Sequence, residues 1–361
     1  MKIFLCVHHL ADGGAERVAS LWAEGFARYG HEVHIVICEG DVPNDYYLPE
    51  RVITHSFFIH GNYFVRYARL VLKLYTLLKK EKPDLAIGVL FPWVMCLLLV
   101  AKPLGIPIIN TEHNAFETPK TLPMSLRLKI EKFFLNKFYD GVTVLTQADK
   151  DIAIRYFKNV FILPNPLAFS QIIEKNHSKN VILAVGRLYD WKLKGFDVLI
   201  KAWGRIAPDY PEWSLRIAGR GKDKDLQELS EIVHSMGVEK QMEFVGFRKD
   251  ILELYKEAEI YVMSSRCEGF GMSLIEAMSQ GCACIACDYH GRQKEIINEN
   301  AGVICPTDDV AAMACCIREL IDDKNLRESI QKRAIKRSHY YDLDKTMTRW
   351  FGILDMLGIH Q

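Results

Sequence analysis

Short apolar runs alternate along the chain with longer stretches whose apolar residues recur at helical spacing. In the first half, apolar runs predict strands at 3–7, 33–38, 85–90, 106–111, 141–145 and 160–163. Amphipathic stretches predict helices at 15–29, 63–78, 94–101 and 126–138. Strands that alternate with helices in this way are typical of a parallel sheet with helices on both faces.

The segment Leu163-Pro164-Asn165-Pro166 interrupts this alternation. Two prolines so close together cannot continue a regular element, so we place a domain boundary after residue 165. The polar stretch 174–180 that follows fits a linker.

The alternation restarts beyond this boundary. Strands are expected at 181–185, 214–218, 242–245, 260–264 and 283–286, and helices at 196–207, 225–236, 251–258, 271–280 and 311–322. The sequence therefore predicts an α/β fold with two Rossmann-like, doubly wound parallel-sheet domains, 1–165 and 166–342. The C-terminal segment 343–361 is expected to return and pack on the first domain. Two such sheets facing each other would form a cleft, where ligand sites concentrate.

Composition narrows the class of protein. The chain has 361 residues, 46 basic against 45 acidic, and a net charge of +1, so charge gives no indication of a nucleic-acid partner. Ten cysteines are scattered, many in apolar runs, which favours buried thiols in a reducing cytoplasm. Cys282, Cys284 and Cys287 lack a second Cys or His cluster at zinc spacing, so we expect no metal site.

Neither a secretory signal nor a membrane span is expected. The first apolar run stops at His8-His9, which is too short for a signal core. The longest apolar stretch, 85–101, contains Pro92 and falls short of the ~20 residues that a spanning helix needs.

Glycines follow the first predicted strand. Gly13 and Gly14 open a helix, and backbone N–H groups at a helix start attract phosphate. A tight turn explains them equally well. The spacing lacks both the dinucleotide fingerprint and the P-loop lysine.

Basic residues follow the first strand of the second domain. Arg187 stands at the expected carboxyl end of that strand, and Lys192 and Lys194 precede the next helix. An arginine can hold a phosphate through two hydrogen bonds, and a lysine adds a point charge, so together they could stabilise a diphosphate leaving group. Gly219, at the end of the next strand, allows either a base or ribose contact or a plain turn.

The segment from Glu268 to Glu276 carries the strongest signal. A strand ends before it, and a helix is expected to start near Met272, which again presents amides for phosphate. The two carboxylates could face one cleft, and carboxylates suit sugar and ribose diols because each oxygen accepts a hydrogen bond. Helix-capping charge is the alternative. The candidate donor-binding residues here are Glu268, Gly269, Phe270, Gly271, Met272, Ser273, Leu274 and Glu276.

His113 follows a strand of the first domain, within Glu112-His113-Asn114. A lone histidine is usually structural. At a carboxyl strand edge, however, it could bond a sugar hydroxyl or the oxygen of the reacting group.

With these residues in hand, the chain resembles the family-four (GT4) retaining glycosyltransferases of the GT-B fold over nearly its whole length. The resemblance rests on 13–17, 112–113, 164–166, 186–188, 194–196 and the spacing of seven residues between Glu268 and Glu276. It implies a hexosyl- or N-acetylhexosaminyl-transferase with a nucleotide-diphosphate sugar, commonly a UDP-sugar, bound by the second domain, and a saccharide acceptor bound by the first.

The resemblance also implies residue roles. Arg187 and a lysine would hold the diphosphate, Glu276 the ribose, and Glu268 and His113 the donor sugar, with amides at 271–274 helping. Lys194 matches the family by preceding a glycine and Lys192 by its distance from Arg187, so both stay candidates. Retention of anomeric configuration, with neither metal nor other cofactor, is expected.

Basic residues lie beside apolar ones in two predicted helices of the first domain. They are Arg66, Arg69, Lys73, Lys79, Lys80 and Lys82 in the first set, and Lys120, Arg127, Lys129, Lys132 and Lys137 in the second. Such a surface can rest on anionic lipid, which would place the enzyme at the inner face of the cell membrane over a saccharide carried on a polyprenyl diphosphate. An ordinary solvated helix face is equally compatible.

Two other functions fit parts of the pattern. A nucleotide-sugar epimerase of similar two-domain build would bind the same donor without an acceptor. A non-catalytic sugar-nucleotide binding protein is disfavoured, because Glu268, Glu276, Arg187 and His113 are all present.

Overall fold

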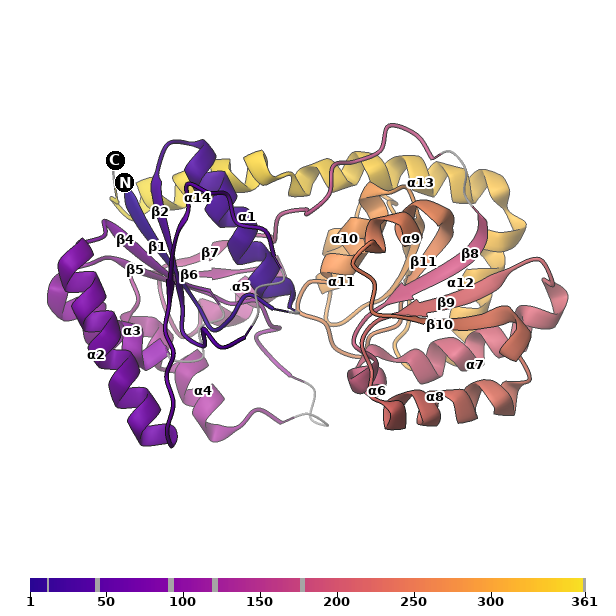
Figure 1. Ribbon diagram of the computed structural model, residues 1–361. Coiled ribbons are helices and arrows are strands. Elements are labelled where there is room, and N and C mark those ends of the chain that lie inside the picture. Colours follow the sequence, from indigo (N-terminus) through magenta and orange to yellow (C-terminus); the bar gives the residue numbers. More distant parts are fainter. Residues whose placement is uncertain (12, 43–45, 90–93, 119–122, 176–178, 360–361) are drawn as a thin grey trace. The chain divides into compact units, whose positions relative to one another are not determined.

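The protein forms two compact units (Figure 1). A computed structural model describes the chain except residues 12, 43–45, 90–93, 119–122, 176–178 and 360–361. Unit 1 comprises Met1–Ala168 and Asp342–Gln361, and unit 2 comprises Phe169–Tyr341. The predicted strand end at residue 90, the break at Pro92 and the basic residue Lys120 lie outside the described residues.

Unit 1 contains a seven-stranded sheet of order β3-β2-β1-β4-β5-β6-β7, paired in parallel throughout. Its strands are β1 Lys2–Val7, β2 Glu32–Ile37, β3 Ile53–Ser56, β4 Leu85–Val89, β5 Ile108–Thr111, β6 Gly141–Val144 and β7 Val160–Ile162. Its helices are α1 Gly14–Arg28, α2 Tyr63–Glu81, α3 Val94–Ala101, α4 Leu126–Phe133, α5 Gln147–Ala153 and α14 Leu343–Met356, with short 3₁₀ turns at η1 Lys102–Leu104 and η2 Leu135–Phe138.

The C-terminal helix α14 belongs to the core of unit 1. The Trp350 ring meets Trp22 of α1 edge-on at 5.1 Å between centroids, and Phe26 at 5.7 Å. Trp22 and Trp350 are fully buried. The aromatic residues of α14 therefore complete a hydrophobic layer that α1 begins.

Unit 2 contains a six-stranded parallel sheet of order β10-β9-β8-β11-β12-β13. Its strands are β8 Lys179–Val185, β9 Ser214–Ala218, β10 Met242–Gly246, β11 Ala258–Met263, β12 Ala283–Cys287 and β13 Val303–Cys305. Its helices are α6 Trp191–Lys194, α7 Phe196–Ile206, α8 Asp223–Met236, α9 Ile251–Glu257, α10 Met272–Ser279, α11 Arg292–Ile296, α12 Val310–Asp322 and α13 Lys324–Ser338, with 3₁₀ turns at 188–190, 207–209, 239–241 and 339–341. The prediction of two parallel-sheet α/β domains is confirmed.

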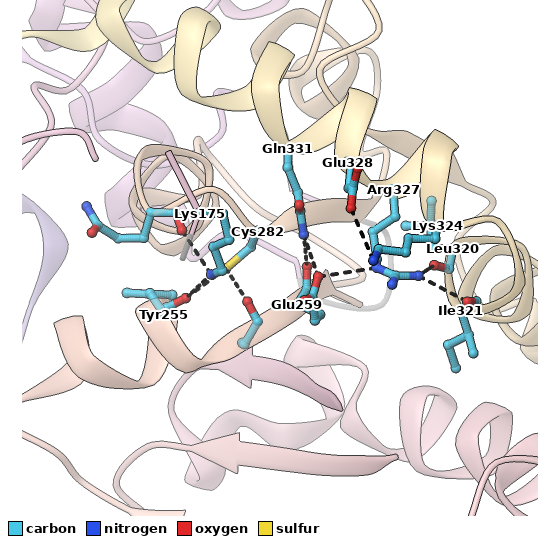
Figure 2. Close-up of polar contacts among 12 residues, drawn as sticks. Lys175, Tyr255, Glu259, Cys282, Leu320, Ile321, Lys324, Arg327, Glu328 and Gln331 are labelled. Atoms are coloured by element: carbon cyan, nitrogen blue, oxygen red, sulfur yellow. Dashed lines mark hydrogen bonds and ion pairs between the residues drawn. The ribbon is translucent and has the colours of Figure 1, made fainter. Parts of the chain in front are cut away.

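The polar stretch expected as a linker is instead anchored to unit 2 where it is described. The Lys175 ammonium donates to the carbonyls of Tyr255 at 2.8 Å and Gln280 at 3.0 Å (Figure 2). Beside it, the Glu259 carboxylate accepts from Gln331 at 2.7 Å and from Arg327 at 3.2 Å, which ties α13 to the start of β11. These contacts line a cavity of about 730 Å³ at the amino edge of the sheet.

Several elements differ from the expectation. The helices α5, α6, α11 and α13 and the strand β13 were not predicted. The predicted helix at 126–138 divides after Phe133, where Asn136 turns its side chain inward to the Lys132 carbonyl at 3.2 Å. Strand β3 was not predicted, because it lies at the sheet edge and three of its four residues are polar.

Candidate active site

The candidate site of unit 2 lies at the carboxyl edge of its sheet, where β8 and β11 are neighbours. The chain leaves β8 toward β9 and β10 and then returns to the other side of β8 to form β11. Such a reversal of strand order opens a crevice between the loops that follow the two strands, and doubly wound sheets bind ligands there.

Lys194 and Glu268 meet at this edge. Lys194 ends the short helix α6 after β8, and Glu268 lies in the loop after β11. The Lys194 Nζ is 2.7 Å from the Glu268 Oε2, and the two side chains are 16% and 20% exposed. A cation and a carboxylate are thus paired at the switch point while both remain partly open to solvent.

The other basic candidates have partners of their own. Lys192 is exposed, and its ammonium rests 5.0 Å from the centre of the Trp191 ring. The Arg187 guanidinium, 52% exposed, pairs with Asp190 at 3.0 Å and lies over the Tyr189 ring. Of the two candidate lysines, Lys194 is the one that contacts Glu268.

The loops after β8 and β11 are joined by hydrogen bonds to three successive carbonyls. Arg266 donates through its side chain to the Lys192 carbonyl and through its backbone N–H to that of Leu193 at 2.8 Å. The Ser264 hydroxyl donates to the Lys194 carbonyl at 2.8 Å. Gly195 follows with φ +65°, and a Cβ there would lie 2.0 Å from the Ser264 carbonyl oxygen.

The carboxylate of Glu276 is held inside unit 2. Glu276 lies in α10, is 5% exposed, and accepts from the Tyr255 hydroxyl at 3.0 Å. The structure therefore does not bring Glu268 and Glu276 together at an open surface, because only the first is partly exposed.

The remaining residues of this segment shape the start of α10. Gly271 precedes the helix with φ +98°, a conformation that favours glycine, and Met272 begins the helix. The Ser273 hydroxyl accepts from Tyr261 at 2.7 Å, and the Phe270 ring is buried against Tyr341. Gly269 and Leu274 flank this turn, Leu274 being fully buried.

Gly219 has a packing reason that does not involve a ligand. A Cβ at this position would lie 1.7 Å from the Gly186 carbonyl oxygen, in the loop after β8. The glycine lets the β9 loop pass close to the β8 loop.

His113 of unit 1 is engaged by its own unit. Its Nδ1 lies 3.1 Å from Asn165 Oδ1 and its Nε2 3.0 Å from Thr111 Oγ1, while the ring packs beside Trp22. Burial lowers the pKa of His113 to about 4, so the ring is neutral near pH 7. An amide oxygen only accepts, so Nδ1 carries the proton and Nε2 is an acceptor.

The glycine pair of unit 1 is covered by a carboxylate. Gly13 caps α1, Gly14 begins it, and a Cβ on Gly13 would meet the Glu16 Oε2 at 1.7 Å. Because a carboxylate already lies at this helix start, an added phosphate would be repelled unless Glu16 moved.

One group of carboxylates and histidine within the described residues has metal-ligand spacing: Glu32, His34 and Glu81. The Lys2 ammonium lies 3.1 Å from Glu32 and 3.0 Å from Glu81 and supplies a cation there. Cys282, Cys284 and Cys287 are buried thiols in or beside β12.

The sequence reasoning did not single out Arg266 and Asp197. The Arg266 guanidinium forms two hydrogen bonds to Asp197, at 2.8 and 2.9 Å. The available signal was an arginine two residues before Glu268, directly after a predicted strand.

Two family descriptions match the two halves of the chain. The description "Glycosyltransferase Family 4" matches residues 12–169, and "Glycosyl transferases group 1" matches residues 168–337. The chain is a GT4-type glycosyltransferase. The recognition made from its motifs is therefore confirmed, and the epimerase alternative is not favoured.

Similar proteins span nearly the same length as this glycosyltransferase. It is 27% identical to "GalNAc-alpha-(1->4)-GalNAc-alpha-(1->3)-diNAcBac-PP-undecaprenol alpha-1,4-N-acetyl-D-galactosaminyltransferase" of Campylobacter jejuni, over 98% of both chains. It is 25% identical to "UDP-Gal:alpha-D-GlcNAc-diphosphoundecaprenol alpha-1,3-galactosyltransferase" of Escherichia coli, over 81% of this chain and 80% of that one.

A solved structure supports the fold of the glycosyltransferase. Anabaena Alr3699/HepE, in complex with UDP and glucose, superposes with a TM-score of 0.81 and 18% identity over 98% of this chain and 99% of that one. The GT-B fold is thereby shown. Among the described residues, no helix is long and apolar enough to span a bilayer.

Proposed function

We propose that this enzyme transfers a sugar from a nucleotide-diphosphate donor, with UDP the first base to test, to a saccharide hydroxyl with retention of configuration. The observation that carries the proposal is the Lys194–Glu268 pair at the carboxyl edge between β8 and β11. A bound donor would exchange this pair for its own groups. Its diphosphate would take the Lys194 ammonium, and a sugar hydroxyl would donate to the Glu268 carboxylate.

The chemistry follows from placing positive charge at the leaving group. The bond between the anomeric carbon and the diphosphate oxygen breaks, and a bond to the acceptor oxygen forms on the same face. The acceptor proton passes to the departing diphosphate. Lys194 and Arg187, with the amides of 271–274, stabilise the charge that develops there. Because these cations neutralise the diphosphate, the reaction is expected to need no divalent metal.

Two further contacts belong to the proposal. The His113 Nε2, an acceptor in the neutral ring, would accept from a donor-sugar hydroxyl, because the Thr111 hydroxyl beside it donates its one proton to the Gly88 carbonyl. Glu276 would accept from the ribose in place of the Tyr255 hydroxyl.

The relatives direct the acceptor proposal toward a lipid-linked saccharide of bacterial glycan biosynthesis. The Campylobacter jejuni and Escherichia coli enzymes both carry undecaprenol in the names of their acceptors. We propose a saccharide on a polyprenyl diphosphate as the acceptor, bound by unit 1, with the reaction at the cytoplasmic face of the membrane.

One surface of unit 1 fits contact with such a membrane. We define the α4 surface as residues 126–130 with Phe134, Lys137 and Phe138; all eight are exposed. The Lys137 ammonium lies 3.7 Å from the centre of the Phe134 ring. Exposed aromatic rings beside lysines are typical of helices that rest at a membrane interface.

Lys132 is not part of this surface, although it was expected to be. It is 3% exposed, lies 3.4 Å from the Glu112 carboxylate and donates to the Ala115 carbonyl at 2.7 Å. The helix turns this lysine inward, so the basic face is smaller than the sequence indicates.

The site proposal is tested with Lys194→Ala and Glu268→Gln. A panel of nucleotide sugars is first screened by thermal shift, and transfer to a synthetic polyprenyl-diphosphate saccharide is then measured with and without chelator. Each variant is expected to lose at least about 100-fold in kcat/KM. Nuclear magnetic resonance of the product is expected to show the anomeric configuration of the donor.

Arg318→Ala serves as the matched control, because Arg318, on α12, forms an exposed ion pair with Asp209 in the 3₁₀ turn 207–209. Wild-type rates in either site variant would remove the site assignment. Inversion, or loss of activity with chelator, would refute the corresponding part of the mechanism.

The membrane proposal is tested by sedimentation with anionic vesicles of phosphatidylglycerol. Phe134→Ser with Phe138→Ser is expected to reduce binding. Ile173→Ser, which removes a fully exposed apolar side chain of unit 2, is expected to leave it unchanged. Equal binding by all three proteins would refute a role of the α4 surface.

A further inference from the structure

Arg266 connects three segments of unit 2 through one guanidinium group. Its Nη1 and Nη2 form hydrogen bonds to the two carboxylate oxygens of Asp197 at 2.8 and 2.9 Å, and its Nε bonds Asp308 at 2.5 Å. Its Nη1 also donates to the Lys192 carbonyl. The hydrogen bonds to Asp197, the largest cause, raise the pKa of Arg266, so its charge is fixed.

These contacts join the two halves of the candidate site. Asp197 lies in the first turn of α7, and Lys192 lies in α6, both after β8. Arg266 itself lies two residues before Glu268 in the loop after β11. Its backbone N–H donates to the Leu193 carbonyl, one residue before Lys194.

The last turn of a short helix is a weak support for a charged side chain, because its carbonyls lack partners within the helix. In α6 the carbonyls of Lys192, Leu193 and Lys194 receive hydrogen bonds from Arg266 and Ser264. The position of Lys194 relative to Glu268 therefore depends on hydrogen bonds between the two loops, in addition to the bond within the segment from the Gly195 N–H to the Lys192 carbonyl.

Arg266 is itself unsuited to hold the donor. Two carboxylates, Asp197 and Asp308, already occupy its guanidinium, and its side chain is 28% exposed. Their two negative charges outweigh its single positive one, so it does not compete with Lys194 for a phosphate.

We propose that Arg266 is a positioning residue that fixes the separation between Lys194 and Glu268. At this separation one donor molecule can bind both side chains, with its diphosphate at the lysine and its sugar at the glutamate. The inference rests on the proposed function. It adds a residue that touches no substrate and that controls whether the two contacts form together.

The first test measures position without any substrate. Lys194 is acylated with a small amine-reactive ester, and its modification rate is followed by mass spectrometry in wild type, Arg266→Ala and Arg318→Ala. Pairing with Glu268 protects the amine, so Arg266→Ala is expected to raise the rate several-fold and the Arg318→Ala control to leave it unchanged. An unchanged rate in Arg266→Ala overturns the inference even if transfer is never detected.

The second test uses binding and turnover. Arg266→Ala is expected to weaken the intact UDP-sugar about 10-fold more than UDP, because only the intact donor needs both contacts. It is also expected to lower kcat about 100-fold, the order expected for a misplacement near 1 Å. Arg266→Lys keeps the charge but cannot form the two-pronged bond to Asp197, so a partial recovery is expected.

The outcomes separate the two proposals. Equal weakening of UDP and UDP-sugar, with a lowered unfolding temperature, would assign Arg266 a purely structural role and overturn the inference. A wild-type enzyme that binds no nucleotide sugar, while Lys194 is still deprotected in Arg266→Ala, would refute the proposed function and leave the positioning role supported.

Discussion

The backbone at Gly195 offers the sharpest test of how the site is built. Gly195 and Gly237 have nearly the same conformation, with φ values of +65° and +68°. They differ in their surroundings: a Cβ at 195 would lie 2.0 Å from the Ser264 carbonyl oxygen, whereas a Cβ at 237 would meet nothing within 4 Å. The two Gly→Ala variants therefore separate the cost of conformation from the cost of contact.

The expected loss of stability in each variant follows from the cost of the left-handed conformation and the cost of the steric contact. A left-handed alanine costs about 1–2 kcal/mol, which applies to both variants. Overpacking adds about 1–3 kcal/mol at residue 195 alone, because the clash is with backbone that cannot rotate away. At roughly 2–4 °C per kcal/mol for a unit of this size, Gly237→Ala is expected to lower the unfolding temperature by about 2–8 °C and Gly195→Ala by roughly 4–20 °C.

The assay combines calorimetric unfolding with donor binding. Gly195→Ala is also expected to weaken donor binding, since the clash pushes Lys194 and the Ser264 carbonyl apart, while Gly237→Ala at the end of α8 is expected to bind normally. Equal unfolding temperatures and equal donor affinities in the two variants would refute the reasoning.

Three further outcomes are expected. Burial lowers the pKa of His113 from 6.5 to about 4, so the unfolded chain takes up a proton at a higher pH than the folded protein does. The free energy of unfolding therefore falls as the pH drops from about 6.5 toward 4. Denaturant titrations should show a smaller difference in this free energy between pH 5 and pH 7 in His113→Gln than in the wild type. Lys132→Met leaves the Glu112 carboxylate without its buried ammonium and is expected to lower the free energy of unfolding by about 3 kcal/mol. Lys129 is exposed, so Lys129→Met is expected to change this free energy little. Equal costs of the two substitutions in denaturant unfolding would contradict the burial argument. Tyr255→Phe removes the hydroxyl that donates to Glu276 and is expected to lower the free energy of unfolding in urea by about 1–3 kcal/mol. An unchanged free energy of unfolding would show that this carboxylate has sufficient other partners.

The periodicity of the sequence predicted the buried strands well because they are nearly continuous apolar runs. Strands β1, β4 and β12 are buried along almost their full length, which leaves no competing pattern. Strand β3 and helix α13 were missed for the opposite reason. Strand β3 is an edge strand with no buried residue, and α13 is a polar helix whose inward residues include Arg327 and Gln331.

The candidate site was predictable as a set of loops but not as a set of contacts. Strand order places the loops of Lys194 and Glu268 at one edge, and the motif spacing named both residues. Sequence spacing carries no signal for the rotamer that turns Glu276 toward Tyr255, because that partner comes from a different helix. The same holds for Lys132, whose partners Glu112 and Ala115 follow β5 rather than lie in its own helix.

Helix α14 makes unit 1 discontinuous, because the chain leaves it after Ala168 and re-enters it at Asp342. Unit 2 can therefore be excised as one uninterrupted fragment, whereas an isolated unit 1 requires a covalent splice of residue 168 to residue 342. A stop codon just before α14 would strip Trp350 from Trp22 and uncover a large aromatic surface. C-terminal truncation is thus expected to damage the half of the enzyme that is encoded first.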